Sequence, residues 1–133
     1  MKKIFFILFI TALISCGKMP INGNLDGRWQ LMTIDCHENG EQTYPEYTYY
    51  DVSLHLMELK RKTANNETSL FFGKKARFQH IDDSLHIQMI RCTKKSVIPF
   101  GMNDTIQHFA VETLTKKKMI LNSGYARLSF RKF

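Results

Sequence analysis

The sequence has no apolar run long enough for a transmembrane helix, and its cysteines lack the spacing of metal or redox centres. It has only three cysteines in 133 residues, and their spacing fits neither a CxxC redox pair nor a paired zinc knuckle. Its one long apolar run, residues 4–14, spans eleven residues. A transmembrane helix needs roughly 20 apolar residues, so this run is too short to cross a bilayer.

Motifs of the common catalytic sites are also missing. The sequence contains no nucleophile elbow, no phosphate-binding glycine loop and no HExxH. The carboxylate pair Asp82-Asp83 is typical of a hairpin turn, where Asp is favoured for its hydrogen bonds to the backbone. We therefore expect no enzyme activity and no cofactor.

Five histidines raise the question of a metal site. His55, His86 and His108 are each out of step with the apolar residues of their predicted strands, so they should lie on the outer, solvated face. His80 keeps the inward phase, and His37 falls in a predicted loop. Because an inward set of three ligands is missing, the pattern favours surface histidines over a metal centre.

The N-terminal segment has the pattern of a secretion signal. Lys2 and Lys3 precede the apolar run, and residues 13–16 read Leu-Ile-Ser-Cys. This ending resembles the lipobox of bacterial lipoproteins, whose cysteine thiol receives a diacylglyceryl group. The resemblance implies removal of residues 1–15 and a stable attachment of the acylated Cys16 to a lipid bilayer. Ordinary signal cleavage beside Cys16 is the alternative.

The rest of the chain divides into a tether and one domain. Residues 16–24 contain Gly, Pro and Asn without an apolar pattern, so we expect a flexible tether. Residues 25–133 are enough for a single domain. The start of the tether lacks the acidic residues associated with surface display, which favours the periplasmic face of the outer or inner membrane. That compartment disfavours nucleic acid as a partner, although the net charge is +7.

Apolar residues recur at every second position through most of the domain, which indicates half-buried β-strands. Helical periodicity is nearly absent. The sets expected to share a face are Trp29, Leu31 and Thr33; Val52, Leu54 and Leu56; Leu70, Phe72, Ala76 and Phe78; Leu85, Ile87 and Met89; Phe109, Val111 and Thr113; Met119 and Leu121; and Ala126, Leu128 and Phe130.

Short breaks with turn chemistry separate these segments, at residues 65–66, 82–84, 115–118 and 122–124. Short connections imply antiparallel neighbours. We therefore predict an all-β fold, an antiparallel up-and-down meander that closes into a barrel of about eight strands, because closure removes exposed edges. Residues 35–48 and 93–105 are less regular and should form loops, a short helical lid or an extra edge strand.

Two cysteines remain once Cys16 is acylated. Cys36 and Cys92 form an even pair in an oxidising compartment, where a disulfide would persist. Whether their Cα atoms come within bonding distance depends on the fold. The sequence leaves open both a bridge and two free, partly buried thiols.

The two ends of the domain carry a family resemblance. Residues 24–31 read NLDGRWQL, with Gly27 and Trp29 forming a Gly-x-Trp start, and the last two segments include KMIL at 118–121 and LSFRK at 128–132. With the lipobox, these motifs resemble the lipocalin-like lipoproteins of Bacteroidetes, small secreted domains of mostly unassigned function. The resemblance implies that Trp29 plugs the closed end of the barrel. It also implies that Arg127 or Arg131, with Arg131 as the main candidate, packs over the Trp29 ring.

The resemblance and the alternating aromatic residues favour a membrane-anchored binding protein for a small hydrophobic ligand. The residues placed to line its site are the inward-phased Phe72, Phe78, Phe109, Val111, Leu128 and Phe130. Simple filling of the core by these side chains is the alternative, since a barrel of about eight strands can be filled by side chains alone.

A tyrosine-rich segment supports a second function. Tyr44, Tyr47, Tyr49 and Tyr50 lie close together around Pro45 and offer amphipathic contact area of the kind found at interfaces. They would serve a non-enzymatic interaction module with a filled barrel and an envelope protein as its partner. Covering the open end of the barrel is the structural alternative for these tyrosines.

Overall fold

The computed structural model describes residues 21–62 and 71–133, with the side chains of residues 71 and 72 left aside. The elements in these ranges are η2 (Gly23–Leu25), β1 (Gly27–Cys36), β2 (Gln42–Thr43), β3 (Thr48–Ser53), β4 (Leu56–Lys62), β5 (Phe71–Ile81), β6 (Ser84–Met89), α2 (Lys94–Val97), η3 (Ile98–Phe100), β7 (Ile106–Leu114), β8 (Lys118–Asn122) and β9 (Ala126–Lys132).

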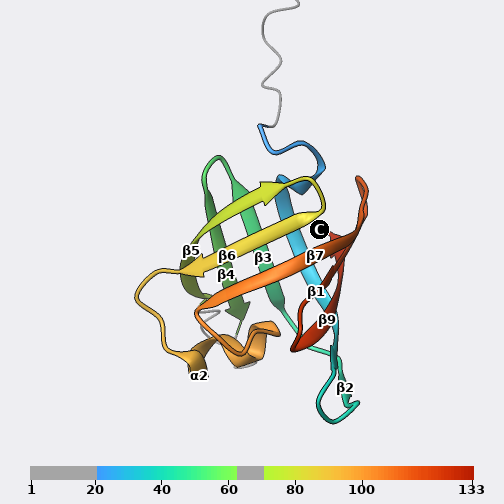
Figure 1. Cartoon of the computed structure of the whole chain (residues 1–133). Helices are drawn as coiled ribbons and strands as arrows, with labels where there is room; N and C mark the ends of the chain where they lie inside the picture. Colours follow the sequence, from blue (N-terminus) through green and yellow to red (C-terminus); the bar gives the residue numbers. More distant parts are fainter. Residues whose placement is uncertain (1–20, 63–70) are drawn as a thin grey trace, which may run out of the picture.

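The strands form one antiparallel sheet that closes on itself (Figure 1). Its order is β2-β1-β3-β4-β5-β6-β7-β8-β9, and β1 also pairs with β9. Eight strands therefore make the barrel, and the two-residue β2 is an extra edge strand beside β1. This confirms the predicted all-β, up-and-down barrel, in which closure leaves no long unpaired edge.

The inward faces follow the predicted alternation along most strands. Every second residue of β6, β8 and β9 is buried, and together these residues form one core with the inward residues of β1, β3 and β4. The fully buried members with the largest side chains are Trp29, Tyr50, Phe109, Leu25, Leu31, Met57, Leu59, Leu85, Ile87, Met102, Met119 and Leu121.

A β-bulge in β1 changes the phase of this strand. Leu31 faces Phe130, but the register shifts before Thr33, which pairs with Ser129 on the outer face. Met32 is the additional residue, and Ile34 then packs against the core. The prediction that Thr33 shares the face of Trp29 was wrong, because a bulge places two residues opposite one and reverses the alternation.

A second bulge has the same effect in β7. The register of β7 against β8 shifts between Val111 and Thr113, and Leu114 rather than Thr113 then packs against the core. Thr113 therefore does not continue the face of Phe109 as predicted. The apolar pattern of the sequence gives no sign of this inserted residue. Leu114 points inward in place of Thr113, and an apolar residue at that position does not by itself indicate a bulge.

The segment predicted as one strand around Val52 is a hairpin. β3 ends at Ser53 and β4 begins at Leu56, with Ser53 and Leu56 paired across a two-residue turn. Val52 is buried as expected, but Leu54 and Leu56 are exposed. The hairpin was missed because its turn has neither Gly nor Asn, and Leu54 itself adopts the left-handed conformation at φ 55°.

The described chain begins inside the segment predicted as a tether. Asn22 donates side-chain hydrogen bonds to Asp26 Oδ1 at 2.6 Å and to the Leu54 carbonyl at 2.8 Å, and Leu25 is buried. Residues 21–24 are thus attached to the barrel, and the expected tether is shorter at this end.

Several predictions fall outside the described residues. They concern the signal segment, Cys16, the turn at residues 65–66, Leu70 and the Phe72 side chain. Within the described ranges, no helix is long and apolar enough to span a membrane.

The structure has Cys36 and Cys92 as free, partly buried thiols, which is the second of the two alternatives that the sequence left open. Cys36 ends β1, and Cys92 follows β6. In the closed strand order, β6 is four strands from β1 in either direction. The two thiols therefore belong to opposite walls of the barrel, with the core between those walls, and a disulfide requires Cα atoms closer than about 7 Å.

Candidate functional site

One end of the barrel is closed by a plug around Trp29. The indole is fully buried and donates a hydrogen bond from Nε1 to the Leu25 carbonyl at 2.8 Å. Lys132 Nζ lies 4.2 Å from the centroid of the Trp29 ring and donates hydrogen bonds to the carbonyls of Asn24 and Asp26. Burial lowers the pKa of Lys132, and the charge of Asp26 opposes this. This end is therefore a structural plug rather than an opening.

The cation over Trp29 is Lys132, and the prediction of Arg131 or Arg127 was wrong. Arg131 donates from Nε to Gln30 Oε1 at 2.8 Å, and Arg127 pairs with Glu112 at 2.9 Å. Both arginines lie on the outer face, because the inward residues of β9 are Ala126, Leu128 and Phe130. Residue 132 continues this inward phase.

Gly27 makes room for that lysine. Its φ of 120° belongs to the region that favours glycine, and a Cβ at this position would lie 2.9 Å from Lys132 Cε. The Gly-x-Trp start therefore has a physical reason. Glycine lets the backbone pass beneath Lys132, and the tryptophan two residues later supplies the ring that the ammonium covers.

The opposite end of the barrel is the mouth, and irregular segments surround it. The loop between β2 and β3 comes from one side and the α2–η3 segment from the other, near the end of β4 and the start of β5 (Figure 1). Thr93 caps α2 by accepting from the Ser96 amide, and Gly101 ends η3 in the left-handed conformation. Loops, a short helical lid or an extra edge strand were expected in residues 35–48 and 93–105 without a choice between the two segments. The structure has the edge strand β2 in the first segment and the short helices α2 and η3 in the second.

A pocket of about 680 Å³ lies at this mouth, and we call it the mouth pocket. Its lining residues are Tyr44, Pro45, Glu46, Tyr47, Arg61, Lys62, Lys74, Ser96, Pro99 and Phe100. A neighbouring hollow of about 310 Å³ shares Tyr44, Pro45, Arg61 and Pro99 with it. The volume of the mouth pocket is within the range of about 300–1,000 Å³ that small-molecule sites occupy.

The mouth pocket combines aromatic rings with positive charge. Tyr44, Tyr47 and Phe100 supply the rings, and Arg61, Lys62 and Lys74 outnumber the one acidic residue of the lining, Glu46. Lys62 Nζ lies 5.6 Å from the centroid of the Tyr47 ring, so part of this charge rests on an aromatic face. Such a lining suits a molecule that has both an apolar body and an anionic group.

The basic residues of this pocket were missed as site residues. Arg61, Lys62 and Lys74 belong to runs of Lys and Arg that resemble ordinary solubilising residues beside a turn. Strand direction was the signal that could have found them. The end of β4 and the start of β5 reach the same rim of an antiparallel sheet, so their basic residues converge.

Most of the predicted ligand-binding residues lie in the core. Phe109, Leu128 and Phe130 are buried members of the core, and Phe78 and Val111 are half-buried and pack against it. The backbone of Phe72 is paired with Arg61 at the mouth. These five residues therefore fill the core or pack against it, and the mouth pocket is lined by a different set of residues.

The four tyrosines divide into two pairs. Tyr44 and Tyr47 are on the mouth loop, with 68% and 47% of their surface exposed, and both line the mouth pocket. Tyr49 and Tyr50 belong to β3 and are buried, so the prediction that they offer a contact surface was wrong. Tyr50 packs edge-on against Phe130 at 4.8 Å between ring centroids, and its hydroxyl donates to the Phe100 carbonyl. Burial raises the pKa of Tyr50.

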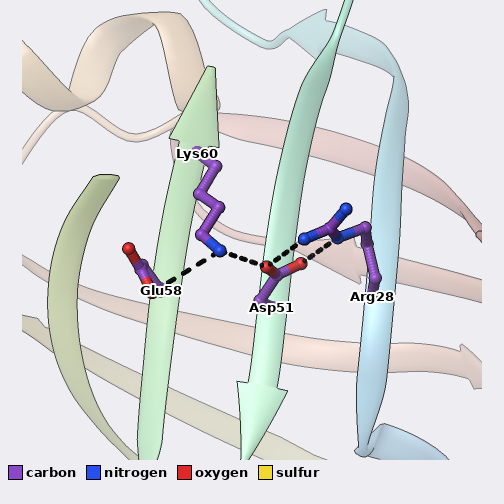
Figure 2. Close-up of polar contacts among 4 residues, drawn as sticks. All are labelled: Arg28, Asp51, Glu58 and Lys60. Carbon is purple, nitrogen blue, oxygen red and sulfur yellow. Dashed lines mark hydrogen bonds and ion pairs between the residues drawn. The ribbon is translucent and has the colours of Figure 1, made fainter. Parts of the chain in front are cut away.

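The outer face of β1, β3 and β4 carries a row of paired charges (Figure 2). Asp51 accepts from Arg28 Nε at 2.9 Å and Nη2 at 3.1 Å, and Lys60 Nζ lies 3.0 Å from its Oδ2. Lys60 also lies 3.7 Å from Glu58 Oε2. Partial burial of Asp51 raises its pKa, but the hydrogen bonds from Arg28 and Lys60 outweigh this and hold the pKa below its usual value. This row joins three strands and is structural.

The histidines are mostly on the outside, as their phase predicted. His86 and His108 are directly opposite one another on β6 and β7, with their Nδ1 atoms in contact, and His55 lines the same outer groove. His37 is exposed and bonds Asn122 at 2.8 Å. Among the described residues, no group of three or more His, Cys, Asp or Glu side chains is arranged to hold a metal ion.

Comparisons with known proteins agree with this architecture. The chain matches the structure of an uncharacterized protein from Bacteroides eggerthii DSM 20697 with a TM-score of 0.67 at 21% identity, over 81% of this chain and 98% of that one. It matches a lipocalin-like protein from Bacteroides uniformis ATCC 8492 with a TM-score of 0.68 at 19% identity, over 84% and 100%. The comparison with curated proteins found no match. The model of the lipocalin-like domain family matches residues 9–133, and the chain belongs to that family.

Proposed function

We propose that this protein is a lipid-anchored binding protein of the bacterial cell envelope, and that it holds a small hydrophobic molecule with an anionic group in the mouth pocket. The observation that carries this proposal is the lining of that pocket, with three aromatic rings beside Arg61, Lys62 and Lys74. The predicted acylation of Cys16 supports the anchored part of the proposal.

The packing of the barrel favours the mouth pocket over the barrel interior as the ligand site. Trp29, Phe109, Leu128 and Phe130 are almost fully buried in the core, so their side chains are already covered. The mouth pocket instead presents Tyr44 and Tyr47 to solvent. An apolar ligand body can cover these rings, and this removes apolar surface from water.

The positive charge of the pocket favours an apolar molecule that carries an anionic group. A guanidinium group such as that of Arg61 can hold a carboxylate or phosphate through two parallel hydrogen bonds, and Lys74 adds a further positive charge. A long-chain fatty acid satisfies both requirements. We therefore expect a fatty acid to bind more tightly than an uncharged fatty alcohol of the same chain length.

Titration of the purified protein with a dansyl-labelled fatty acid, followed by fluorescence, tests this function. Arg61→Gln together with Lys74→Gln should weaken binding by about tenfold or more, since hydrogen bonds to charged groups contribute about 1.5–3 kcal/mol each. Lys94→Gln with Lys95→Gln removes the same charge from α2, outside the pocket lining, and should leave binding unchanged. Equal weakening by both double variants, or no saturable binding, would exclude the mouth pocket as a fatty-acid site.

The exposure of Tyr44 and Tyr47 favours a second candidate function, docking of an envelope protein on the mouth loop. Tyr44→Ala with Tyr47→Ala should then abolish co-purification of a protein partner, whereas the Arg61 and Lys74 variants should not. Retention of the partner by the tyrosine variant would remove this candidate.

A further inference from the structure

Several large apolar side chains are exposed at the end of the barrel opposite the mouth. Leu54 lies in the β3–β4 turn, Ile81 lies at the end of β5, Ile21 opens the described chain and Phe133 is its last residue. Their exposed fractions are 64%, 57%, 57% and 66%, respectively. Large apolar residues gathered at one end of a soluble domain commonly mark an interaction surface.

Lysines accompany these apolar residues. The β7–β8 turn contains Lys116, Lys117 and Lys118, all exposed, and the Lys132 amide bonds the Lys117 carbonyl at 2.8 Å, which holds this turn beside the end of β9. Asp82 and Asp83 in the β5–β6 turn offset part of this charge. Apolar side chains beside lysines fit the interface of an anionic bilayer, where the apolar groups enter the headgroup region and the lysines attract the lipid charge.

The β3–β4, β5–β6 and β7–β8 turns lie at the same end of the barrel as the blue start of the described chain (Figure 1). Four residues lie between Cys16 and Ile21, so five Cα–Cα steps join the two positions. Because a fully extended chain spans at most about 3.6 Å per residue, Cys16 can lie no more than roughly 18 Å from Ile21. An acyl chain on Cys16 would therefore keep this end, and not the mouth, next to the membrane.

We infer that the closed end of the barrel docks on an anionic lipid bilayer through Leu54, Ile81 and the 116–118 lysines. Phe133 is not included, because its ring packs edge-on against Tyr49 on the outer wall. This inference rests on the proposed lipid anchor. It fixes the orientation of the domain, because the mouth pocket, at the other end of the barrel, then faces away from the membrane and remains open to ligands or partners from the aqueous side.

Lysine footprinting tests this orientation. The acylated full-length protein is reconstituted in phosphatidylcholine vesicles with or without phosphatidylglycerol, and amine acetylation is followed by mass spectrometry. Lys116, Lys117 and Lys118 should react at least about threefold more slowly on the anionic vesicles than in detergent, since the bilayer covers them. Lys94 and Lys95 on α2, at the mouth end, are an internal control and should react equally fast in both.

A second variant tests the apolar contacts. Leu54→Ser with Ile81→Ser leaves the lysines in place and removes two exposed side chains that are not part of the core. It should restore the acetylation rate of the 116–118 lysines towards the detergent value.

Each contrary outcome has a distinct meaning. Protein that does not float with the vesicles would contradict the lipid anchor itself, and the docking would fall with it. Protein that floats with its 116–118 lysines as reactive as in detergent, or with Lys94 and Lys95 protected instead, would overturn the docking and leave the anchor intact.

Discussion

The Lys132 ammonium group lies 4.2 Å from the centroid of the Trp29 ring, and this contact joins the last strand of the barrel to the first. The two residues are also paired across β1 and β9, the strands whose pairing closes the barrel. Lys132 also reaches the carbonyls of Asn24 and Asp26. One side chain therefore links barrel closure, the buried tryptophan and the segment that enters the domain.

Replacing Lys132 tests this link. Lys132→Met keeps an apolar stem over Trp29 but removes the charge and two hydrogen bonds to carbonyl groups, so the free energy of unfolding should fall by about 2 kcal/mol. Urea denaturation measures the change. Arg131→Met at the exposed neighbouring position should cost less than about 0.5 kcal/mol. A loss at position 131 as large as the loss at position 132 would contradict the assignment of the cation.

Gly27 should be equally intolerant of a side chain. Gly27→Ala places a Cβ 2.9 Å from Lys132 Cε at a backbone φ of 120°, so we expect a loss of stability. The cost should be of order 1–3 kcal/mol, as for other residues held in unfavourable backbone regions. Gly124→Ala is the matched control, because a Cβ there meets no atom within 4 Å. Thermal unfolding of both variants provides the comparison.

The paired charges around Asp51 predict a loss of stability in acid. The pKa of Asp51 is lower in the folded protein than its ordinary value of 3.8. Its contribution is therefore complete above pH 3.8 and is lost as the pH falls through the folded-state pKa. Asp51→Asn should lower the free energy of unfolding near neutral pH by about 1 kcal/mol. It should also make the loss of stability below pH 3.8 less steep.

Urea denaturation at several pH values, repeated with Asp83→Asn from the exposed β5–β6 turn, separates this contribution from those of the other carboxylates. If the Asp51→Asn protein loses stability in acid as steeply as the unchanged protein, the paired charges do not cause the decline.

The cysteines should be free in protein purified without reductant. Cys36 and Cys92 belong to opposite walls of the barrel, so reduction should leave the mass of the mature protein unchanged rather than add two hydrogens. Thiol titration of the unfolded protein should find both groups reactive. Cys36→Ser with Cys92→Ser should not cause the loss of about 2–5 kcal/mol that follows removal of a native disulfide. A mass increase on reduction would contradict this strand order.

The residues that line the mouth pocket could not be predicted as one site from the apolar pattern of the sequence. Alternation along β4 was not recognised because the β3–β4 turn lacks Gly and Asn, and so the strand that ends at Arg61 and Lys62 was missing from the predicted order. Without that strand, no reasoning from the sequence could place those residues beside Lys74 and the tyrosines. The two bulges were hidden for a related reason, since an inserted residue changes the phase without changing the apolar content.

The sequence by itself determined the fold class and its closure. Every second position of most segments is apolar, and a chain of short antiparallel strands with that pattern tends to close into a barrel, because closure removes exposed edges. It also determined that Trp29 is buried and that His86 and His108 point outward, because these depend only on the local phase of a strand. His55 is exposed for another reason, since it lies in the β3–β4 turn.

Only the tertiary structure decided which distant residues meet. The cation over Trp29, the separation of the cysteines and the composition of the mouth pocket all depend on strand order and register around a closed barrel. The inward faces of all the strands must be buried in one common core, and this fixes the register and order of the strands. The local sequence does not reveal which strand ends then lie side by side at one end of the barrel.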